Sequence, residues 1–151
     1  MSFTVTKVDI WSSKIEDKPG GLANVLGALG DAGASLDCVI ARRDPAKPGT
    51  GVVFLTPVKG AAARKSAQAK GVAPAKKLAT LKIEGDDAAG LGGRIATAIA
   101  DAGINLRGAS AAVIGKKFVA YLGFDNAADA TKAARSLKTL ASPKKSEKAK
   151  R

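Results

Sequence analysis

The segment DKPGGLANVLGALGDAGASL, residues 17–36, contains a turn, an amphipathic helix and the start of a strand. Proline and glycine at its beginning are typical of a chain reversal before a helix. Apolar residues then recur at i, i+3, i+4 and i+7, which predicts a helix with one buried face. These residues are Leu22, Val25, Leu26 and Leu29. Gly33 in Asp31-Ala32-Gly33 predicts the end of that helix, because glycine is favoured just beyond a helix C-terminus.

The same arrangement returns in DAAGLGGRIATAIADAGINL, residues 87–106, which begins 70 positions after residue 17. Asp-Ala-Gly recurs at the end of the helix, and the helix again has one apolar face, formed by Leu91, Ile95, Ala98 and Ile99. Agreement of loop, helix face and stop signal at one spacing indicates an internal repeat. We therefore predict two units with the same fold.

Strands with β-branched or alternating apolar residues flank each predicted helix, and a second helix follows in each unit. The expected strands are 5–11, 35–40, 52–55, 78–83, 104–114 and 118–124, and the expected second helices are 60–70 and 126–137. The fourth strand of the pattern is weak at 71–74, and none is predicted after Leu140. The order βαββαβ indicates an α+β fold of two ferredoxin-like units, with the fourth strand weak or missing. The expected domains are 1–74 and 75–140, followed by a basic flexible tail, 141–151.

The net charge of +12 comes from 25 basic and 13 acidic residues, and it is unevenly distributed. Residues 59–82 carry seven basic and no acidic side chains, and residues 132–151 carry eight basic and one acidic. Such segments are usually solvated helix faces or tails, but they also contact nucleic acid without reading its sequence. The six aromatic residues lie outside both segments, which argues against a stacking platform for single strands.

Composition excludes several kinds of chemistry. The chain has no histidine and a single cysteine, Cys38, so Ser-His-Asp catalysis, histidine-containing metal sites and an intramolecular disulfide are ruled out. The glycine-rich run at residues 90–93 has Ile95 where a dinucleotide-binding motif needs its third glycine. We predict no enzyme activity, no cofactor and no metal. No stretch is long and apolar enough for a membrane span and no signal-peptide layout is present, so we expect a cytoplasmic protein.

The loop Asp-Lys-Pro-Gly-Gly-Leu, followed after the helix by Ala-Gly-Ala-Ser-Leu, resembles an ACT domain. The second half matches in Gly90-Leu91 and in Ala102-Gly103-Ile104-Asn105-Leu106 but lacks the proline. The chain, apart from its tail, thus resembles two tandem ACT domains. The resemblance implies a regulatory module that binds an amino acid where two domains meet. Their sheets would pair side by side, with the ligand held between the first loop of one domain and the second strand of the other.

A free amino acid offers a carboxylate and an ammonium group. The amides at a helix N-terminus suit the carboxylate, and Asp17 could accept from the ammonium. The residues alone favour a simple turn into a capped helix, and it is the resemblance that gives the binding site equal weight. The predicted ligand-binding residues are Asp17, Lys18, Pro19, Gly20, Gly21, Leu22, Ser35 and Leu36 in the first unit, and Asp87, Ala88, Gly90, Leu91, Ile104, Asn105 and Leu106 in the second.

The sequence is compatible with three functions. The first is a non-catalytic regulator or sensor that binds a small amino acid and acts on a regulated enzyme or another protein. The second is a basic, nucleic-acid-associated protein, and the third is an interaction adaptor without a ligand. The missing fourth strands also predict a homodimer, because an uncovered sheet edge exposes unpaired amides. No membrane partner is expected, and nucleic-acid binding is expected to be weak and non-specific.

Overall fold

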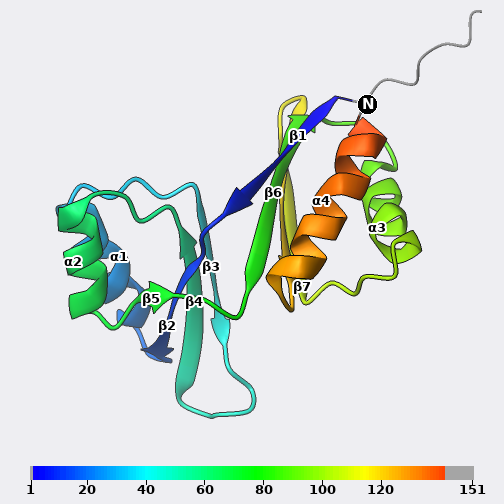
Figure 1. Cartoon of the computed structure of the whole chain (residues 1–151). Helices are drawn as coiled ribbons and strands as arrows, with labels where there is room; N and C mark the ends of the chain where they lie inside the picture. The colour runs from blue at the N-terminus through cyan, green and yellow to red at the C-terminus, as the bar shows by residue number, and fades with distance from the viewer. Residues whose placement is uncertain (1, 142–151) are drawn as a thin grey trace, which may run out of the picture. The chain divides into compact units, whose positions relative to one another are not determined.

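The computed structural model describes residues 2–141, which form two compact units. Residues 8–76 make up the inserted unit. Residues 2–7 and 77–141 together make up the enclosing unit. The chain therefore passes from the enclosing unit into the inserted unit and then back into the enclosing unit. Figure 1 shows the first strand and the last helix of the chain in the same unit. None of the helices within residues 2–141 has the length and apolar character needed to cross a membrane.

The inserted unit is a four-stranded antiparallel sheet with two helices. Its elements are β2 (Trp11–Glu16), α1 (Gly21–Asp31), β3 (Cys38–Arg43), β4 (Thr50–Thr56), α2 (Ala61–Ala69) and β5 (Ala73–Pro74). The strand order is β3-β4-β2-β5. Val25 and Leu29 of α1, as the helical period predicts, are buried in one core with Val53 and Leu55 of β4.

The enclosing unit has the same plan with a larger core. Its elements are β1 (Phe3–Val8), β6 (Ala79–Asp86), α3 (Leu91–Asp101), β7 (Gly108–Ile114), β8 (Lys117–Phe124) and α4 (Ala127–Ala141). The strand order is β1-β6-β8-β7. Ile95 and Ile99 of α3 pack in this core with Leu137 of α4. The Asn126 side chain caps α4, since its Oδ1 accepts a hydrogen bond from the Asp129 amide at 2.8 Å.

Both strand orders match the ferredoxin-like plan, which confirms the predicted α+β fold of two repeated units. The fourth strand of the inserted unit, β5, has only two residues, in keeping with the weak strand expected there. In the enclosing unit the fourth-strand position is occupied by β1, which comes from the opposite end of the chain. The sheet edge that the sequence left open after α4 is therefore covered within residues 2–141.

The strand expected over residues 5–11 is divided between the two sheets. Residues up to Val8 belong to β1, and residues from Trp11 belong to β2. Residues 2–7 consequently lie in the enclosing unit and not in the first expected domain, 1–74. The β-strand pattern of the sequence is local, and it does not specify which sheet a strand joins. Of the expected tail, 141–151, only Ala141 lies within the described residues, as the last residue of α4.

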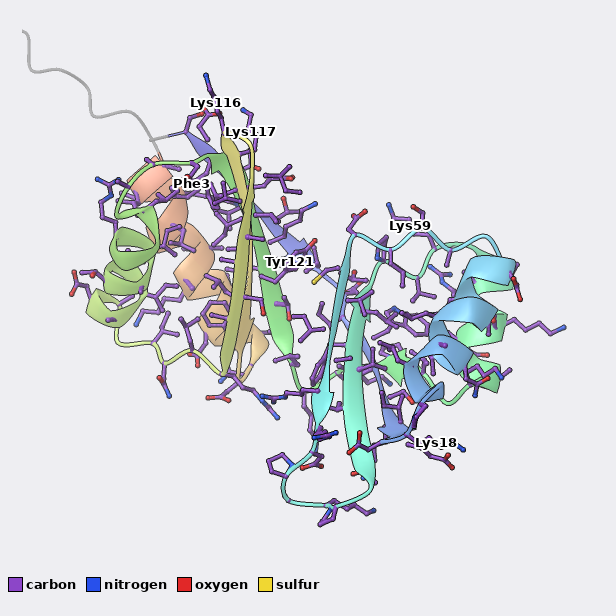
Figure 2. The ribbon with its side chains drawn as sticks, turned by 180° about the vertical axis from the view of Figure 1, so that it is seen from behind. Phe3, Lys18, Lys59, Lys116, Lys117 and Tyr121 are labelled. Carbon is purple, nitrogen blue, oxygen red and sulfur yellow. The ribbon has the colours of Figure 1, made fainter. Side chains whose placement is uncertain are left out.

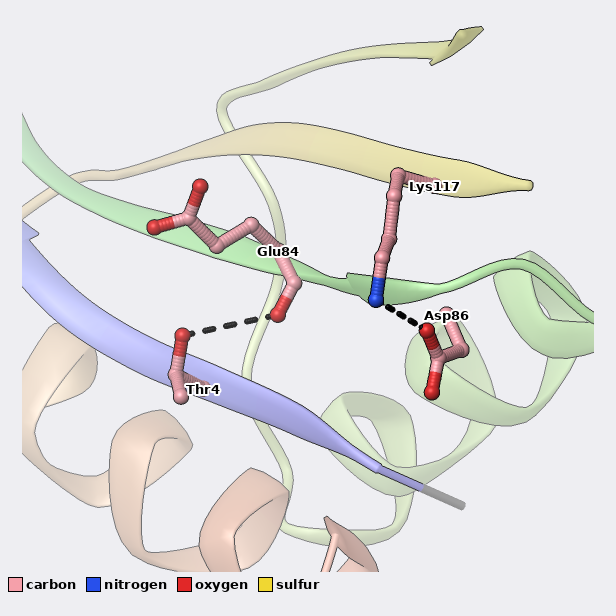
Figure 3. Close-up of polar contacts among 4 residues, drawn as sticks. All are labelled: Thr4, Glu84, Asp86 and Lys117. Atoms are coloured by element: carbon pink, nitrogen blue, oxygen red, sulfur yellow. Dashed lines mark hydrogen bonds and ion pairs between the residues drawn. The ribbon is translucent and has the colours of Figure 1, made fainter. Parts of the chain in front are cut away.

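β1 is held against β6 by packing and by polar contacts. The buried Phe3 ring meets Phe118 edge to face, with ring centroids 6.2 Å apart. The Asp86 amide donates to the Ser2 carbonyl at 3.2 Å, and the Thr4 hydroxyl donates to the Glu84 carbonyl (Figure 3). These contacts run in opposite chain directions, as an antiparallel pair requires.

Gly85 lets β1 approach closely. A Cβ atom at this position would lie 2.3 Å from the Ser2 carbonyl oxygen and 2.7 Å from the Phe3 Cα atom. Both atoms belong to the backbone, so they cannot move aside without displacing the strand.

Gly85→Ala should therefore destabilise the protein by about 1–3 kcal/mol, the usual penalty for overpacking. The matched control is Gly93→Ala in α3 of the same unit, where a Cβ would meet nothing within 4 Å. Alanine at that helical position should leave stability unchanged or raise it by about 0.5–1 kcal/mol. Urea unfolding of both variants measures the difference, and equal effects would show that β1 does not press on Gly85.

Candidate functional site

Each unit begins its first helix from a glycine in the left-handed conformation. Gly20 precedes α1 with φ 87°, and Gly90 precedes α3 with φ 78°. No side chain caps either helix. The first helical amide in each case donates to the preceding loop, from Gly21 to the Lys18 carbonyl at 3.1 Å and from Leu91 to the Ala88 carbonyl at 3.2 Å. The next amides of each first turn are therefore available to an acceptor from outside the helix.

The β-hairpin beside each loop fixes its position. The Asp17 amide donates to the Gly49 carbonyl at 3.1 Å, and the Asp87 amide donates to the Lys116 carbonyl at 2.8 Å. Asp17 and Asp87 are equivalent positions of the repeat, and Gly49 and Lys116 both lie in the connection between the second and third strands of their units. The second loop thus has the same backbone arrangement as the first, although it lacks the proline at residue 19.

Gly21 differs from its equivalent in the second unit, which is Leu91. A Cβ on Gly21 would lie 2.2 Å from the Glu16 carbonyl oxygen, so the chain passes too close to β2 for any side chain. Leu91, by contrast, is buried in the core of the enclosing unit. The loop before α1 therefore lies tightly on the end of its sheet, and glycine at residue 21 is a steric requirement there.

Charged side chains surround both loops, and most of them already have partners. The Asp17 carboxylate accepts from the Arg43 Nε atom at 2.9 Å. Lys18, which is labelled in Figure 2, forms an exposed ion pair with Glu16 at 2.5 Å. The hydrogen bond between them, with their mutual charge, lowers the pKa of Glu16 and raises the pKa of Lys18. Asp17 can accept a ligand ammonium group only by sharing with Arg43 or releasing it.

The second loop has a different charge arrangement. Lys117 pairs with Asp86 (Figure 3), whereas Asp87 forms no ion pair within residues 2–141. The Arg94 guanidinium reaches back from α3 and donates to the Ala89 carbonyl at 3.3 Å. This places a positive charge at the N-terminus of α3, where it adds to the positive end of the helix dipole and favours an anion.

The other predicted site residues lie at the far end of each helix. Ser35 and Asn105 follow the C-termini of α1 and α3 and are exposed. A helix of 11 residues is about 16 Å long, so one unit does not bring Ser35 to Asp17, or Asn105 to Asp87. The two halves of the predicted site could meet only if different units contributed them, as the resemblance to ACT domains implies.

Five of the predicted residues are engaged in the cores, including the buried Leu91 and the partly buried Leu22. Ile104 is buried, and Leu36 and Leu106 pack against the cores of their own units. Their side chains are therefore directed inward, and only their backbone atoms remain to contact a ligand. Arg43 and Arg94, by contrast, were not among the predicted residues. Their places beside the loops depend on hairpin pairing and on a helix turn, and no sequence motif marks either of them.

No group of three or more potential metal ligands occurs within residues 2–141. Cys38 is half-buried at the start of β3, where burial, together with the neighbouring Asp37 carboxylate, raises the pKa of its thiol. A raised pKa leaves less of the reactive thiolate at neutral pH. Neither observation indicates catalytic chemistry at these loops.

Comparison with known proteins finds solved structures that share this fold. No protein-family model matches the chain, and no curated protein matches its sequence. The regulatory subunit of aspartate kinase from Thermus thermophilus is 20% identical, with a TM-score of 0.64 over 92% of this chain and 96% of that one. The chain has the fold of this regulatory subunit. The resemblance to tandem ACT domains is thus confirmed as a likeness of fold.

Two further structures show the range of this likeness. A protein of Bacteroides thetaiotaomicron matches with a TM-score of 0.73 and 12% identity, over 89% of this chain and 90% of its own. Aspartokinase III of E. coli, solved in complex with aspartate and ADP, matches with a TM-score of 0.58 and 13% identity. That match covers 93% of this chain but 33% of the aspartokinase chain. This fold therefore occurs both as a separate subunit and as part of a longer enzyme chain.

The pairing of Asp17 with Arg43 should be weak, because exposed ion pairs contribute about 0–1 kcal/mol. We expect a double-mutant cycle of Asp17→Asn and Arg43→Gln to give a coupling energy below about 1 kcal/mol at low salt and near zero in about 1 M salt. Chemical denaturation of the four proteins measures this value. A coupling energy of several kcal/mol would mean that Asp17 is committed to Arg43 and unsuited to receive a ligand.

Proposed function

We propose that this protein is a non-catalytic regulatory protein that binds a small amino acid at its two loop–helix junctions. These junctions are the places where the loops at Asp17–Gly20 and Asp87–Gly90 meet the N-termini of α1 and α3. The observation that carries the proposal is the repeated pairing of an uncapped helix N-terminus with an adjacent acidic residue. An amino acid carries the two complementary groups. Its carboxylate would accept from the first-turn amides of α1 or α3, and its ammonium group would donate to Asp17 or Asp87.

The two junctions are not equivalent as binding sites. At the first, the ammonium group would compete with Arg43 for the Asp17 carboxylate. At the second, Arg94 would strengthen the attraction for the ligand carboxylate, and Asp87 has no competing ion pair within residues 2–141. We expect the junction at α3 to bind more tightly than the junction at α1.

Regulation would follow if binding joins a loop of one domain to the exposed Ser35 or Asn105 of another. A ligand that bridges two domains stabilises the arrangement in which they meet, and so shifts the population of conformations. Similarity to regulatory subunits of aspartate kinase supports a regulated enzyme as partner. We further propose a homodimer as the assembly that brings the domains together. We expect the protein to act in the cytoplasm.

A second candidate is weak, non-specific binding to nucleic acid, with the basic side chains around α2 as its basis. Lys59, Arg64 and Lys65 are exposed and form no ion pairs within the described residues; Lys59 is labelled in Figure 2. Such binding would depend steeply on salt, with dissociation constants of about 10⁻⁴–10⁻⁶ M. A protein with neither activity would be an interaction adaptor.

A thermal-shift screen with the twenty common amino acids tests the proposal directly. A ligand at 100 times its dissociation constant stabilises the folded state by about 2.7 kcal/mol, which raises the melting temperature by several degrees. Asp87→Asn should remove most of this shift because it deletes the negative charge that receives the ammonium group. Asp101→Asn, at the other end of α3, is the matched control and should leave the shift unchanged.

No shift with any of the twenty at millimolar concentration would contradict the sensor proposal and leave the adaptor. A shift that survives both Asp17→Asn and Asp87→Asn would show that the ligand binds elsewhere.

A further inference from the structure

Thr56, the last residue of β4, is buried and forms hydrogen bonds through both of its oxygen atoms. Its hydroxyl donates to the Asp9 carbonyl at 2.9 Å, and its own carbonyl accepts from the Asp37 amide at 2.9 Å. Only 4% of its surface is exposed. A buried hydroxyl that keeps a partner avoids the cost of an unsatisfied polar group. Thr56 therefore joins two segments that are far apart in the chain, one at Asp9 and one at Asp37.

Both segments occupy positions that matter for the candidate site. Asp9 lies in the connection between β1 and β2, where the chain passes from the enclosing unit into the inserted unit. The next residue, Ile10, is also held, because its carbonyl accepts from the Ala75 amide at 2.8 Å. Asp37 follows Ser35, the exposed residue predicted to contact a ligand, by two positions. Thr56 thus connects one end of the candidate site to the crossing between the units.

The enclosing unit has the backbone part of this arrangement without the side-chain part. Gly123 takes the place of Thr56, since each residue pairs with the first residue of the neighbouring edge strand in its own sheet. The Arg107 amide donates to the Gly123 carbonyl at 2.8 Å, which repeats the backbone bond of the inserted unit. Glycine has no hydroxyl group. The side-chain link is therefore specific to the inserted unit, whose strand β2 continues directly from β1.

Strand β1 is suited to carry a displacement to Asp9. Its neighbour in the sheet is β6, and within residues 2–141 no strand pairs with its other side. A shift of β1 is therefore resisted by one strand, whereas a central strand is held by two. At the start of β1, the Ser2 carbonyl accepts from the Asp86 amide, next to Asp87 of the junction at α3. β1 consequently connects that junction to the crossing at Asp9.

We propose that Thr56 is a positioning residue that couples the segment from Ser35 to Asp37 to the crossing at Asp9, and through β1 to the junction at α3. Its regulatory use rests on the proposed function, because an amino acid bound at the junction at α3 would then alter the segment that carries Ser35. Coupling requires an element whose arrangement both sites influence, and the β1–β2 connection is that element.

Hydrogen exchange of single amides, followed by NMR, tests the coupling without a ligand. Gly85→Ala displaces β1, because its Cβ would lie 2.3 Å from the Ser2 carbonyl oxygen. The Asp37 amide should then exchange about fivefold faster than in the wild type, since local opening sets the exchange rate. The Ala34 amide, which donates to the end of α1, is the internal reference and should be unchanged. Gly93→Ala is the control substitution and should leave both amides unchanged.

Thr56→Val removes the hydroxyl and keeps a side chain of similar shape. In this background Gly85→Ala should no longer change the exchange rate of the Asp37 amide, and the cycle of single and double variants measures the coupling. Thr80→Val is the matched control. Thr80 is also buried, but its hydroxyl has no hydrogen-bond partner within residues 2–141. In the Thr80→Val background the effect of Gly85→Ala should persist in full.

Far-UV circular dichroism establishes that each variant is folded. If Gly85→Ala does not fold, Phe3→Leu replaces it, because it weakens the ring contact with Phe118 that holds β1. An Asp37 exchange rate that stays unchanged in the folded variant would overturn the coupling. A rate that rises equally with and without the Thr56 hydroxyl would overturn the role of Thr56. The amino-acid screen is read separately, since an absent thermal shift contradicts the proposed function and leaves the exchange rates unaffected.

Discussion

Pairing of β1 with β6 is the contact on which the organisation of the chain depends. A ferredoxin-like unit needs a fourth strand beside its first, and the segment after α3, β7 and β8 ends in a helix within the described residues. The N-terminal strand fills that position, held by the Phe3 and Phe118 rings and by the close approach that Gly85 permits. As a consequence, residues 8–76 are inserted within the enclosing unit, and β1 and β2 are consecutive strands of different sheets. A displacement of one strand therefore reaches the other through only two residues, Asp9 and Ile10.

The two loop–helix junctions show how a repeat can keep a geometry while changing its chemistry. Both use a left-handed glycine and an amide-to-carbonyl bond to the neighbouring hairpin, so both present the N-terminus of an uncapped helix. The ionic surroundings differ, because Arg43 engages the acid at one junction and Arg94 lies beside the helix N-terminus at the other. Because electrostatic attraction decides how firmly a small zwitterion is held, the same backbone geometry at the two junctions does not imply the same ligand affinity. A regulator with two unequal sites would respond over a wider range of ligand concentration than one with two equal sites.

Basic residues lie both at these junctions and away from them: Lys70, at the end of α2, donates to the Asn24 side chain in the first turn of α1 at 2.9 Å. Lys59, Arg64 and Lys65 are exposed, on α2 and just before it, whereas Val53, Leu55 and their counterparts form cores without charge.

Several features could be read from the sequence alone. The apolar period of residues 22–29 and its return at 91–99 determined two amphipathic helices, and Gly33 and Gly103 determined where they end, because these signals act within a few residues. The repeated order of strands and helices was sufficient to predict the fold class. Asn126, as a capping residue, was sufficient to predict the start of α4. The tertiary structure alone decided that β1 and β2 belong to different sheets, that Arg43 reaches Asp17, and that Leu36 and Leu106 face the cores. Strand partnership and ion pairing join residues far apart in the chain, and their free energies depend on packing in three dimensions, which a local pattern does not contain.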